Sequence, residues 1–185
     1  MPMVQDKGDS IVIKGSKFYY ALMFFATVGF LIACIFLIIH GLKFNSKYSL
    51  FYLGGGIIFT PFYLYISLWS LPGFKPGKVL LKIVPGDNGK VVGKRSTVSI
   101  KNIRNIDLIR NPLNLINDIV IETFDDKKVK FRTYNLIDDG DFQVIVDKYI
   151  FPFMNDNAKK VWDRKIDLDK LKEEDNYVRQ EHKIE

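Results

Sequence analysis

Cysteine and histidine are scarce in this 185-residue sequence, and their scarcity removes several classes of site. The single cysteine, Cys34, cannot form an internal disulfide or build a cysteine-rich zinc site. The two histidines, His40 and His182, lie at the edge of an apolar segment and near the C-terminus, so neither is expected to serve as the base of a nucleophilic triad. The sequence also lacks a P-loop and a Gly-x-Gly-x-x-Gly motif. We therefore expect no enzyme activity, no cofactor and no metal site.

Charged residues are absent from two long windows, Phe18–Leu42 and Tyr48–Phe74. A helix rises about 1.5 Å per residue, so roughly 20 apolar residues cross a hydrocarbon core about 30 Å thick. We predict transmembrane helices over residues 18–42 and 48–74, joined by an external loop at residues 43–47. A signal peptide is the rival interpretation of the first window, but the apolar run is too long and no small-x-small site follows it. The lack of charge in both windows argues against a pump, a channel or a proton relay.

The distribution of lysine and arginine predicts how this hairpin is oriented. The loop carries Lys43 and Lys47, whereas three lysines precede the first window and six cations follow the second within about 20 residues. Because cytoplasmic flanks carry the excess of cations, we expect both termini in the cytoplasm, with residues 1–17 as a cytoplasmic N-terminal segment too short to fold alone. The chain is then a multi-pass protein of the cell membrane.

The second window contains small residues and a proline, namely Gly54, Gly55, Gly56 and Pro61. Small residues let two membrane helices approach closely, and a proline inside a helix often kinks it. We interpret the four as helix-packing residues that seat the second span on the first. The alternatives are a homodimer face and a hinge. Cys34 is expected to be a small apolar residue of the first span.

After Lys75 the apolar residues fall into short β-type runs separated by turn residues. An amphipathic helix follows, which Asp138 or Asp139 can cap and in whose last turn Pro152 falls. The acidic pair Asp125 and Asp126 is typical of a turn, and a carboxylate metal site would need further ligands to converge. The strand candidates are residues 79–84, 90–94, 97–100, 102–110, 118–124 and 128–134, and the apolar stripe of the helix is Phe142, Ile145, Val146, Tyr149, Ile150 and Phe153.

These patterns predict an α-helical transmembrane hairpin followed by a cytoplasmic α+β domain over residues 75–155. The domain is expected to be an antiparallel sheet or a partly open barrel, with a C-terminal amphipathic helix that buries its stripe on the sheet. Residues 156–185 are rich in charge and are expected to form a helical or disordered tail. In the N-terminal segment, Ile11–Ile13 is a candidate for a short added strand.

Four stretches of the predicted domain resemble bacterial PH-like domains attached to membranes. These stretches are Ser99–Ile106, Ile119–Thr123, Asp126–Phe131 and Tyr149–Pro152, and the similarity covers about residues 78–154. Ser99–Ile106 contains the I-x-x-I-x-x-I form of a strand in that group. With the two-span hairpin, the whole layout resembles small uncharacterised YfjD-like membrane proteins of Gram-positive bacteria. The resemblance implies a PH-like cytoplasmic domain, and it brings no catalytic residues.

Cations are concentrated directly after the second span. Residues 75–110 hold nine basic and two acidic residues, a balance of +7, whereas residues 111–185 hold thirteen basic and seventeen acidic residues, a balance of −4. Near an anionic leaflet each cation contributes about 1 kcal/mol of attraction. Nucleic-acid binding is disfavoured, because the basic region has few interleaved aromatic residues and the acidic half repels phosphate. The candidate lipid-facing basic residues are Lys90, Lys94, Arg95, Lys101 and Arg104.

Two hypotheses of different class follow. The first is a non-catalytic, membrane-anchored interaction module, an accessory or scaffold protein whose PH-like domain holds a protein partner. The second is a sensor of anionic lipid surface, with membrane lipids as the partner. The acidic tail favours the first, since an anionic surface would repel it. An immunity-type membrane protein that guards against a toxin is a third, weaker alternative.

Overall fold

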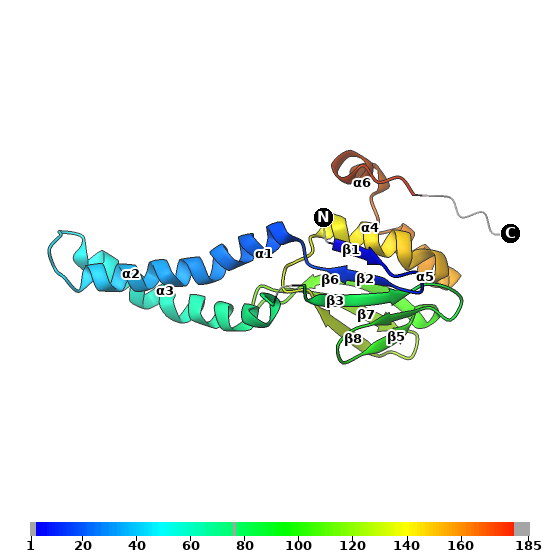
Figure 1. Cartoon of the computed structure of the whole chain (residues 1–185), viewed down its shortest axis with the longest axis horizontal. Coiled ribbons are helices and arrows are strands. Elements are labelled where there is room, and N and C mark those ends of the chain that lie inside the picture. Colours follow the sequence, from blue (N-terminus) through cyan, green and yellow to red (C-terminus); the bar gives the residue numbers. More distant parts are fainter. Residues whose placement is uncertain (1–2, 76, 180–185) are drawn as a thin grey trace.

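The computed structural model describes residues 3–75 and 77–179, and it shows an elongated molecule. Two long antiparallel helices project from one end of a domain that combines β-sheets with shorter helices (Figure 1). The predicted class, a helical hairpin with an α+β domain, agrees with this architecture. The helices are α1 (Lys17–Phe24), α2 (Phe30–Gly41), α3 (Ser49–Ser70), α4 (Asp139–Tyr149), α5 (Asp156–Asp163) and α6 (Leu168–Asp175).

The hairpin helices coincide with the two uncharged windows. A π-helical segment, Phe25–Gly29, joins α1 to α2, so helical structure is continuous over Lys17–Gly41. The second arm, α3, stays continuous through Pro61 and ends in a 3₁₀ turn at Leu71–Gly73. Both arms are long and apolar enough to cross a membrane, and only 11% and 17% of their apolar windows is buried inside the protein. Helices that belonged to a soluble core would be mostly buried instead.

Of the predicted packing residues, Gly56 is the one at the helix contact. A Cβ atom on Gly56 would lie 2.6 Å from the Ile38 side chain and 2.9 Å from the Cys34 carbonyl oxygen, so α2 and α3 meet at backbone distance here. Gly54 and Gly55 have nothing within 4 Å of such an atom. Cys34 is 5% exposed and packs at this contact. The glycine run therefore divides into one packing position and two positions that face away from α2.

Two antiparallel sheets form the domain. The first has the order β1-β2-β3-β4-β5 and the second the order β6-β7-β8. The strands are β1 (Met3–Asp6), β2 (Ile11–Lys14), β3 (Val79–Val84), β4 (Lys90–Val92), β5 (Thr97–Ser99), β6 (Ile103–Arg110), β7 (Asn117–Thr123) and β8 (Lys128–Arg132).

The N-terminal segment belongs to the first sheet. Ile11 lies opposite Ile83 and Ile13 opposite Leu81, so β2 pairs directly with β3 across 64 intervening residues from Gly15 to Lys78. The whole helical hairpin is thus an insertion between two neighbouring strands. This corrects the prediction that the domain begins at residue 75 and that residues 1–17 form a separate segment. Residues 3–14 belong to the domain, because their backbone groups pair within the sheet and Ile11, Val12 and Ile13 are buried there.

Apolar side chains from both sheets and from α4 form one core. Ile13, Ile83, Ile103 and Ile121 are completely buried. The predicted stripe of α4 packs into this core through its most buried members, Phe142, Ile145, Val146 and Ile150. Burying a side chain of this size contributes about 1.5–3 kcal/mol, so the core is the main stabilising element of the domain.

The polar segment after residue 155 is helical as far as Asp175. Trp162 in α5 is 4% exposed and Leu171 in α6 is 2% exposed, so both helices pack on the domain. Of the two predicted states of this segment, helical or disordered, the structure shows the helical one as far as Asp175, and these helices extend the domain. Residues 180–185 lie outside the described part of the chain.

The two kinds of glycine in α3 give a direct test of the hairpin packing. We expect Gly56→Ala to destabilise the protein by about 1–3 kcal/mol, because the new methyl group meets α2 backbone. Gly55→Ala is the matched control and should be neutral or stabilising by up to about 1 kcal/mol, through helix propensity alone. Thermal unfolding in detergent micelles measures both. Equal effects of the two substitutions would contradict the packing role of Gly56.

Candidate functional site

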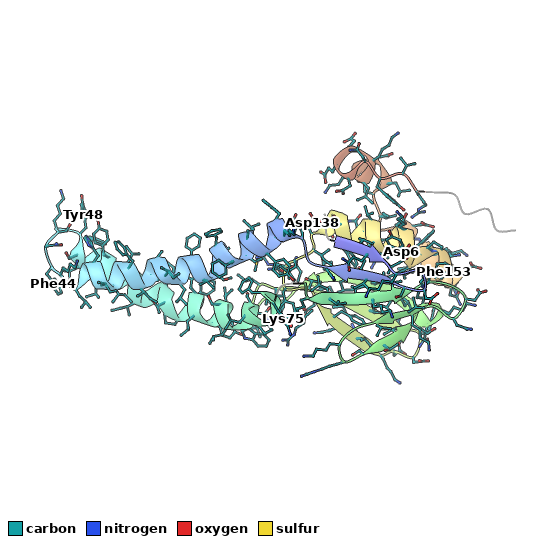
Figure 2. All side chains as sticks on the ribbon, viewed as in Figure 1. Asp6, Phe44, Tyr48, Lys75, Asp138 and Phe153 are labelled. Atoms are coloured by element: carbon teal, nitrogen blue, oxygen red, sulfur yellow. The ribbon has the colours of Figure 1, made fainter. Side chains whose placement is uncertain are left out.

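The candidate site is the junction where the hairpin enters the domain. β2 ends at Lys14 and α1 begins at Lys17, while β3 begins six residues after Gly73. Both connections are short, so the helices leave the sheet from adjacent strands. Figure 2 shows Lys75 and Asp138 at this junction, with Phe44 and Tyr48 at the far tip of the hairpin.

Residues 133–138, which link β8 to α4, pack directly against both ends of the hairpin. A Cβ atom on Gly15 would lie 2.7 Å from Cβ of Leu136, and one on Gly73 would lie 2.7 Å from Cβ of Tyr134. Only glycine allows approaches this close. The Ser16 N–H also donates to the Leu136 carbonyl at 3.1 Å. The β8–α4 link thus serves as the seat of the hairpin.

A hydrogen-bond relay ties the first helix to α4. The Tyr19 hydroxyl donates to Oδ2 of Asp138 at 2.5 Å, and Oδ1 of the same carboxylate accepts from the Asp141 N–H at 2.7 Å as the N-cap of α4. The predicted cap at Asp138 is confirmed, and it has this second role. Tyr20 connects the two arms, since its hydroxyl donates to the Lys75 carbonyl at 3.4 Å. Movement of α1 would disturb the α4 cap.

Two cation–aromatic pairs lie at the same level. The Arg132 guanidinium lies 4.7 Å from the centre of the Trp69 ring in the last turns of α3, and the Lys78 ammonium lies 3.7 Å from that of Tyr134. Such contacts contribute about 0.5–1 kcal/mol where exposed and more where water is excluded. The first pair joins the second arm to β8, and the second pair joins the residue before β3 to the β8–α4 link.

The start of α4 gathers negative charge. Burial in the first turn of α4, reinforced by the charge of Asp138, raises the pKa of Asp141 to about 6. Burial and the charge of Asp138 also raise the pKa of Asp175, whose carboxylate lies against Gly140. Among the described residues, no group of three or more His, Cys, Asp or Glu side chains could hold a metal ion.

A second polar cluster holds the chain after α6 on the domain. The Asp147 carboxylate is fully buried and accepts hydrogen bonds from the Trp162 indole at 2.9 Å and from the Tyr177 hydroxyl at 2.8 Å. Arg179 donates to it through Nε at 2.9 Å and through a terminal nitrogen at 2.5 Å, and it also reaches Asp163 at 2.7 Å. These carboxylates raise the pKa of Arg179, and burial with the Asp147 contact raises that of Tyr177. The buried charge is therefore paired and saturated with donors.

The five candidate lipid-facing cations do not form one cluster. Lys101 pairs with Asp87 in the β3–β4 turn at 3.3 Å, and Arg104 pairs with Asp126 at 2.6 Å and with Glu122 at 3.6 Å. Lys90 follows the β3–β4 turn, at the opposite end of β3 from the hairpin. Lys94 and Arg95 are exposed in the β4–β5 turn. Lys101 and Arg104 thus have protein partners, and the other three are divided between two turns.

Sequence patterns did not indicate Tyr19, Trp69, Asp147 or Arg132 as junction or cluster residues. Each contact joins segments at least 15 residues apart and depends on the tertiary packing. The enclosed space in the core offers no polar anchor for a cofactor, because its walls are entirely apolar. They come from Leu81, Val91, Ile106, Ile119, Ile137, Phe142, Ile145, Val146 and Ile150.

Comparison with known proteins gives a family and two relatives. A model described as a family of unknown function (DUF5381) matches residues 9–172. The uncharacterized lipoprotein YfjD of Bacillus subtilis (strain 168) is 32% identical over 157 residues, which cover 82% of this chain and 85% of that protein. The uncharacterized protein YfjE of the same strain is 32% identical over 126 residues, 65% of this chain and 83% of that protein. No solved structure matches. The resemblance to YfjD-like proteins is confirmed.

Removal of the buried carboxylate tests the cluster around Asp147. We expect Asp147→Ala to cost about 3–5 kcal/mol, because it strips partners from Trp162, Tyr177 and Arg179 at once. Asp163→Ala removes the exposed partner of the same arginine and should cost no more than about 1 kcal/mol. Urea unfolding of the full chain in micelles, followed by tryptophan fluorescence, separates the two. Similar costs would show that burial of Asp147 adds nothing.

Proposed function

This chain belongs to the DUF5381 family, and we propose that it is a non-catalytic, membrane-anchored interaction module. In this proposal the hairpin crosses the cell membrane twice and the α+β domain is a PH-like scaffold in the cytoplasm. The observation that carries it is the insertion of an apolar, exposed hairpin between two paired strands, β2 and β3. Such an insertion anchors a folded domain without interrupting its sheet.

Membrane association is indicated by the surface of the hairpin. Large apolar side chains are exposed along both arms, among them Phe25, Phe36, Phe51 and Ile58, with exposed fractions of 66–78%. A soluble monomer rarely exposes a continuous apolar surface of this kind. The relative YfjD is described as a lipoprotein, and an attached lipid binds a protein to a membrane.

We propose that this chain keeps its first span rather than losing it as a cleaved signal. Cleavage after an N-terminal apolar segment removes everything before it. Removal up to Cys34, the one cysteine of the first apolar segment, would delete β1, β2 and α1, and it would leave β3 paired with β4 alone. The family match begins at residue 9, so β2 is part of the shared region.

Strand pairing supports one part of the proposed orientation independently of charge, and the choice between the two sides of the membrane depends on charge. Because β2 and β3 lie side by side, both ends of the hairpin must be on the same face of the membrane. The excess of cations outside the hairpin loop then favours the cytoplasmic face for the domain and for both termini.

A PH-like domain is supported by the order of the elements. β1 and β2 add two strands to the six expected from the sequence, and they enlarge the first sheet before α4 closes the core. For a protein partner, the edge strand β1 offers exposed residues from Val4 to Asp6, to which an extended segment could add as a further strand. The enclosed space in the core between the sheets and α4 is lined by apolar side chains alone, so it supplies no acid, base or nucleophile.

Alkaline phosphatase fusions test the orientation. A fusion at Asn45, in the hairpin loop, should be active, because the enzyme matures only outside the cytoplasm. A fusion at Glu185, which lies beyond the described residues, should be inactive. An N-terminal epitope should remain on the same full-length band as a C-terminal epitope.

The reverse pattern of phosphatase activity would overturn the cytoplasmic placement of the domain. Loss of the N-terminal epitope from the band would overturn the retained first span. Normal expression of both fusions, read from immunoblots, is the control for an inactive reporter.

A further inference from the structure

An exposed patch at the junction end of the second sheet combines apolar and basic side chains. We call it the basal patch and define it as Ile109, Arg110, Leu113 and Arg132. Leu113 is 77% exposed and Ile109 is 49% exposed, and both arginines are exposed. A single exposed leucine is ordinary. Here Ile109 and Arg132 both lie opposite Asp118 in the register of the sheet, Arg110 is the last residue of β6, and Leu113 follows in the β6–β7 loop.

Hydrogen bonds place the β6–β7 loop beside the seat of the hairpin. Arg110 lies opposite Asn117 in the sheet. The Asn117 N–H donates to the Asn135 side chain at 2.6 Å, and the Asn135 amide donates to the Leu115 carbonyl at 3.0 Å. The next residue, Leu136, is the one that contacts Gly15 and Ser16. The loop is therefore at the end of the domain from which the helices emerge, as the directions of β6 and β8 in Figure 1 also show.

The loop is built to present Leu113 outward. The Asn111 side chain accepts from the Leu113 N–H at 2.9 Å, and the Asn114 side chain, 6% exposed, accepts from the Ile116 N–H at 3.1 Å. The Leu115 N–H donates to the Asn111 carbonyl at 2.8 Å. Since these bonds fix the backbone on both sides of Leu113, its exposure is a property of the fold.

The level of the patch follows from one contact. Arg132 stacks on Trp69 in the last turns of α3, and tryptophan rings favour the headgroup region of a bilayer. Arg132 is then at the height of lipid phosphates whenever the hairpin is inserted. Asp118 lies opposite Arg132 in the β7–β8 register, and burial raises the pKa of that carboxyl although the charge of Arg132 acts to lower it. The basic character of the patch is thereby only partly offset.

We propose that the basal patch docks on the anionic bilayer that holds the hairpin. Leu113 enters the boundary between headgroups and acyl chains, while Arg110 and Arg132 contact lipid phosphates. The proposal rests on the membrane anchoring proposed above, and it fixes the domain against the surface instead of leaving it free to swing. It also replaces Lys101 and Arg104, which have protein partners, as the lipid-facing cations. Each exposed cation increases the partition coefficient for an anionic surface roughly fivefold.

Depth-dependent quenching in nanodiscs tests this docking on the full chain. In a Cys34→Ala background, an environment-sensitive label is attached at Leu113→Cys, at Phe124→Cys or at Ile58→Cys. Phe124 is the matched control, because it is an exposed apolar residue in the β7–β8 turn at the other end of the sheet. Ile58 reports insertion of the hairpin. The lipids are phosphatidylglycerol with phosphatidylcholine, or phosphatidylcholine alone, each with brominated acyl chains.

We expect bromine to quench the labels at positions 58 and 113 and to leave that at 124 unquenched. Quenching at 113 should fall several-fold without phosphatidylglycerol, and also in the Arg110→Gln, Arg132→Gln variant. Quenching at 58 alone would overturn the docking and leave the anchoring intact, whereas no quenching at 58 would overturn the anchoring itself. Equal quenching at 113 with and without phosphatidylglycerol would overturn the role of the arginines. A label at 113 that bromine spares but that is shielded from iodide would mean that protein covers the patch, and this would overturn lipid contact.

Discussion

The pairing of β2 with β3 is the constraint on which the rest of the structure depends. It brings together residues on either side of the helical hairpin, with Ile13 opposite Leu81 and both side chains buried. The backbone hydrogen bonds of this ladder can form only if both arms of the hairpin start from one place. The apolar helices are therefore a structural part of the domain and not an appendage at its N-terminus.

The contacts at the junction follow from that constraint. Once the arms leave adjacent strands, glycines at positions 15 and 73 allow the β8–α4 link to pack between them. Tyr19 and Trp69 then reach Asp138 and Arg132, so that each arm is tied to a different element of the domain. Tilt or rotation of the helices would act on the α4 cap and on β8 directly.

Patterns with a short range in the sequence predicted much of the fold. The uncharged windows, the six strands and the stripe and cap of α4 could be recognised because each is defined by residues that are close together in the sequence. The pairing of β2 with β3 was not predictable in this way, since four residues such as Ile11–Lys14 carry little signal and their partner strand lies beyond the hairpin. The candidate cations failed to form one surface for a related reason: the sequence shows charge but not which carboxylate lies opposite, as for Arg104 and Asp126. The tail was only half predicted, because Trp162 packs against Phe142 and donates to Asp147, contacts with residues 15 or more positions earlier in the chain.

The most direct test of this account is a disulfide across the β2–β3 ladder. Val12 and Lys82 are opposite each other, and residues opposite one another in antiparallel strands have Cα atoms about 4.5–5.5 Å apart, within the range of a disulfide. In a Cys34→Ala background, Val12→Cys with Lys82→Cys should cross-link rapidly when membranes that contain the protein are treated with an oxidant. Val12→Cys with Lys90→Cys should not, because Lys90 is in β4, on the other side of β3. Rapid cross-linking of the first pair alone is the result that the inserted hairpin predicts. Failure of that pair to cross-link, with both thiols accessible to alkylation, would show that β2 is not in the sheet and would contradict the account.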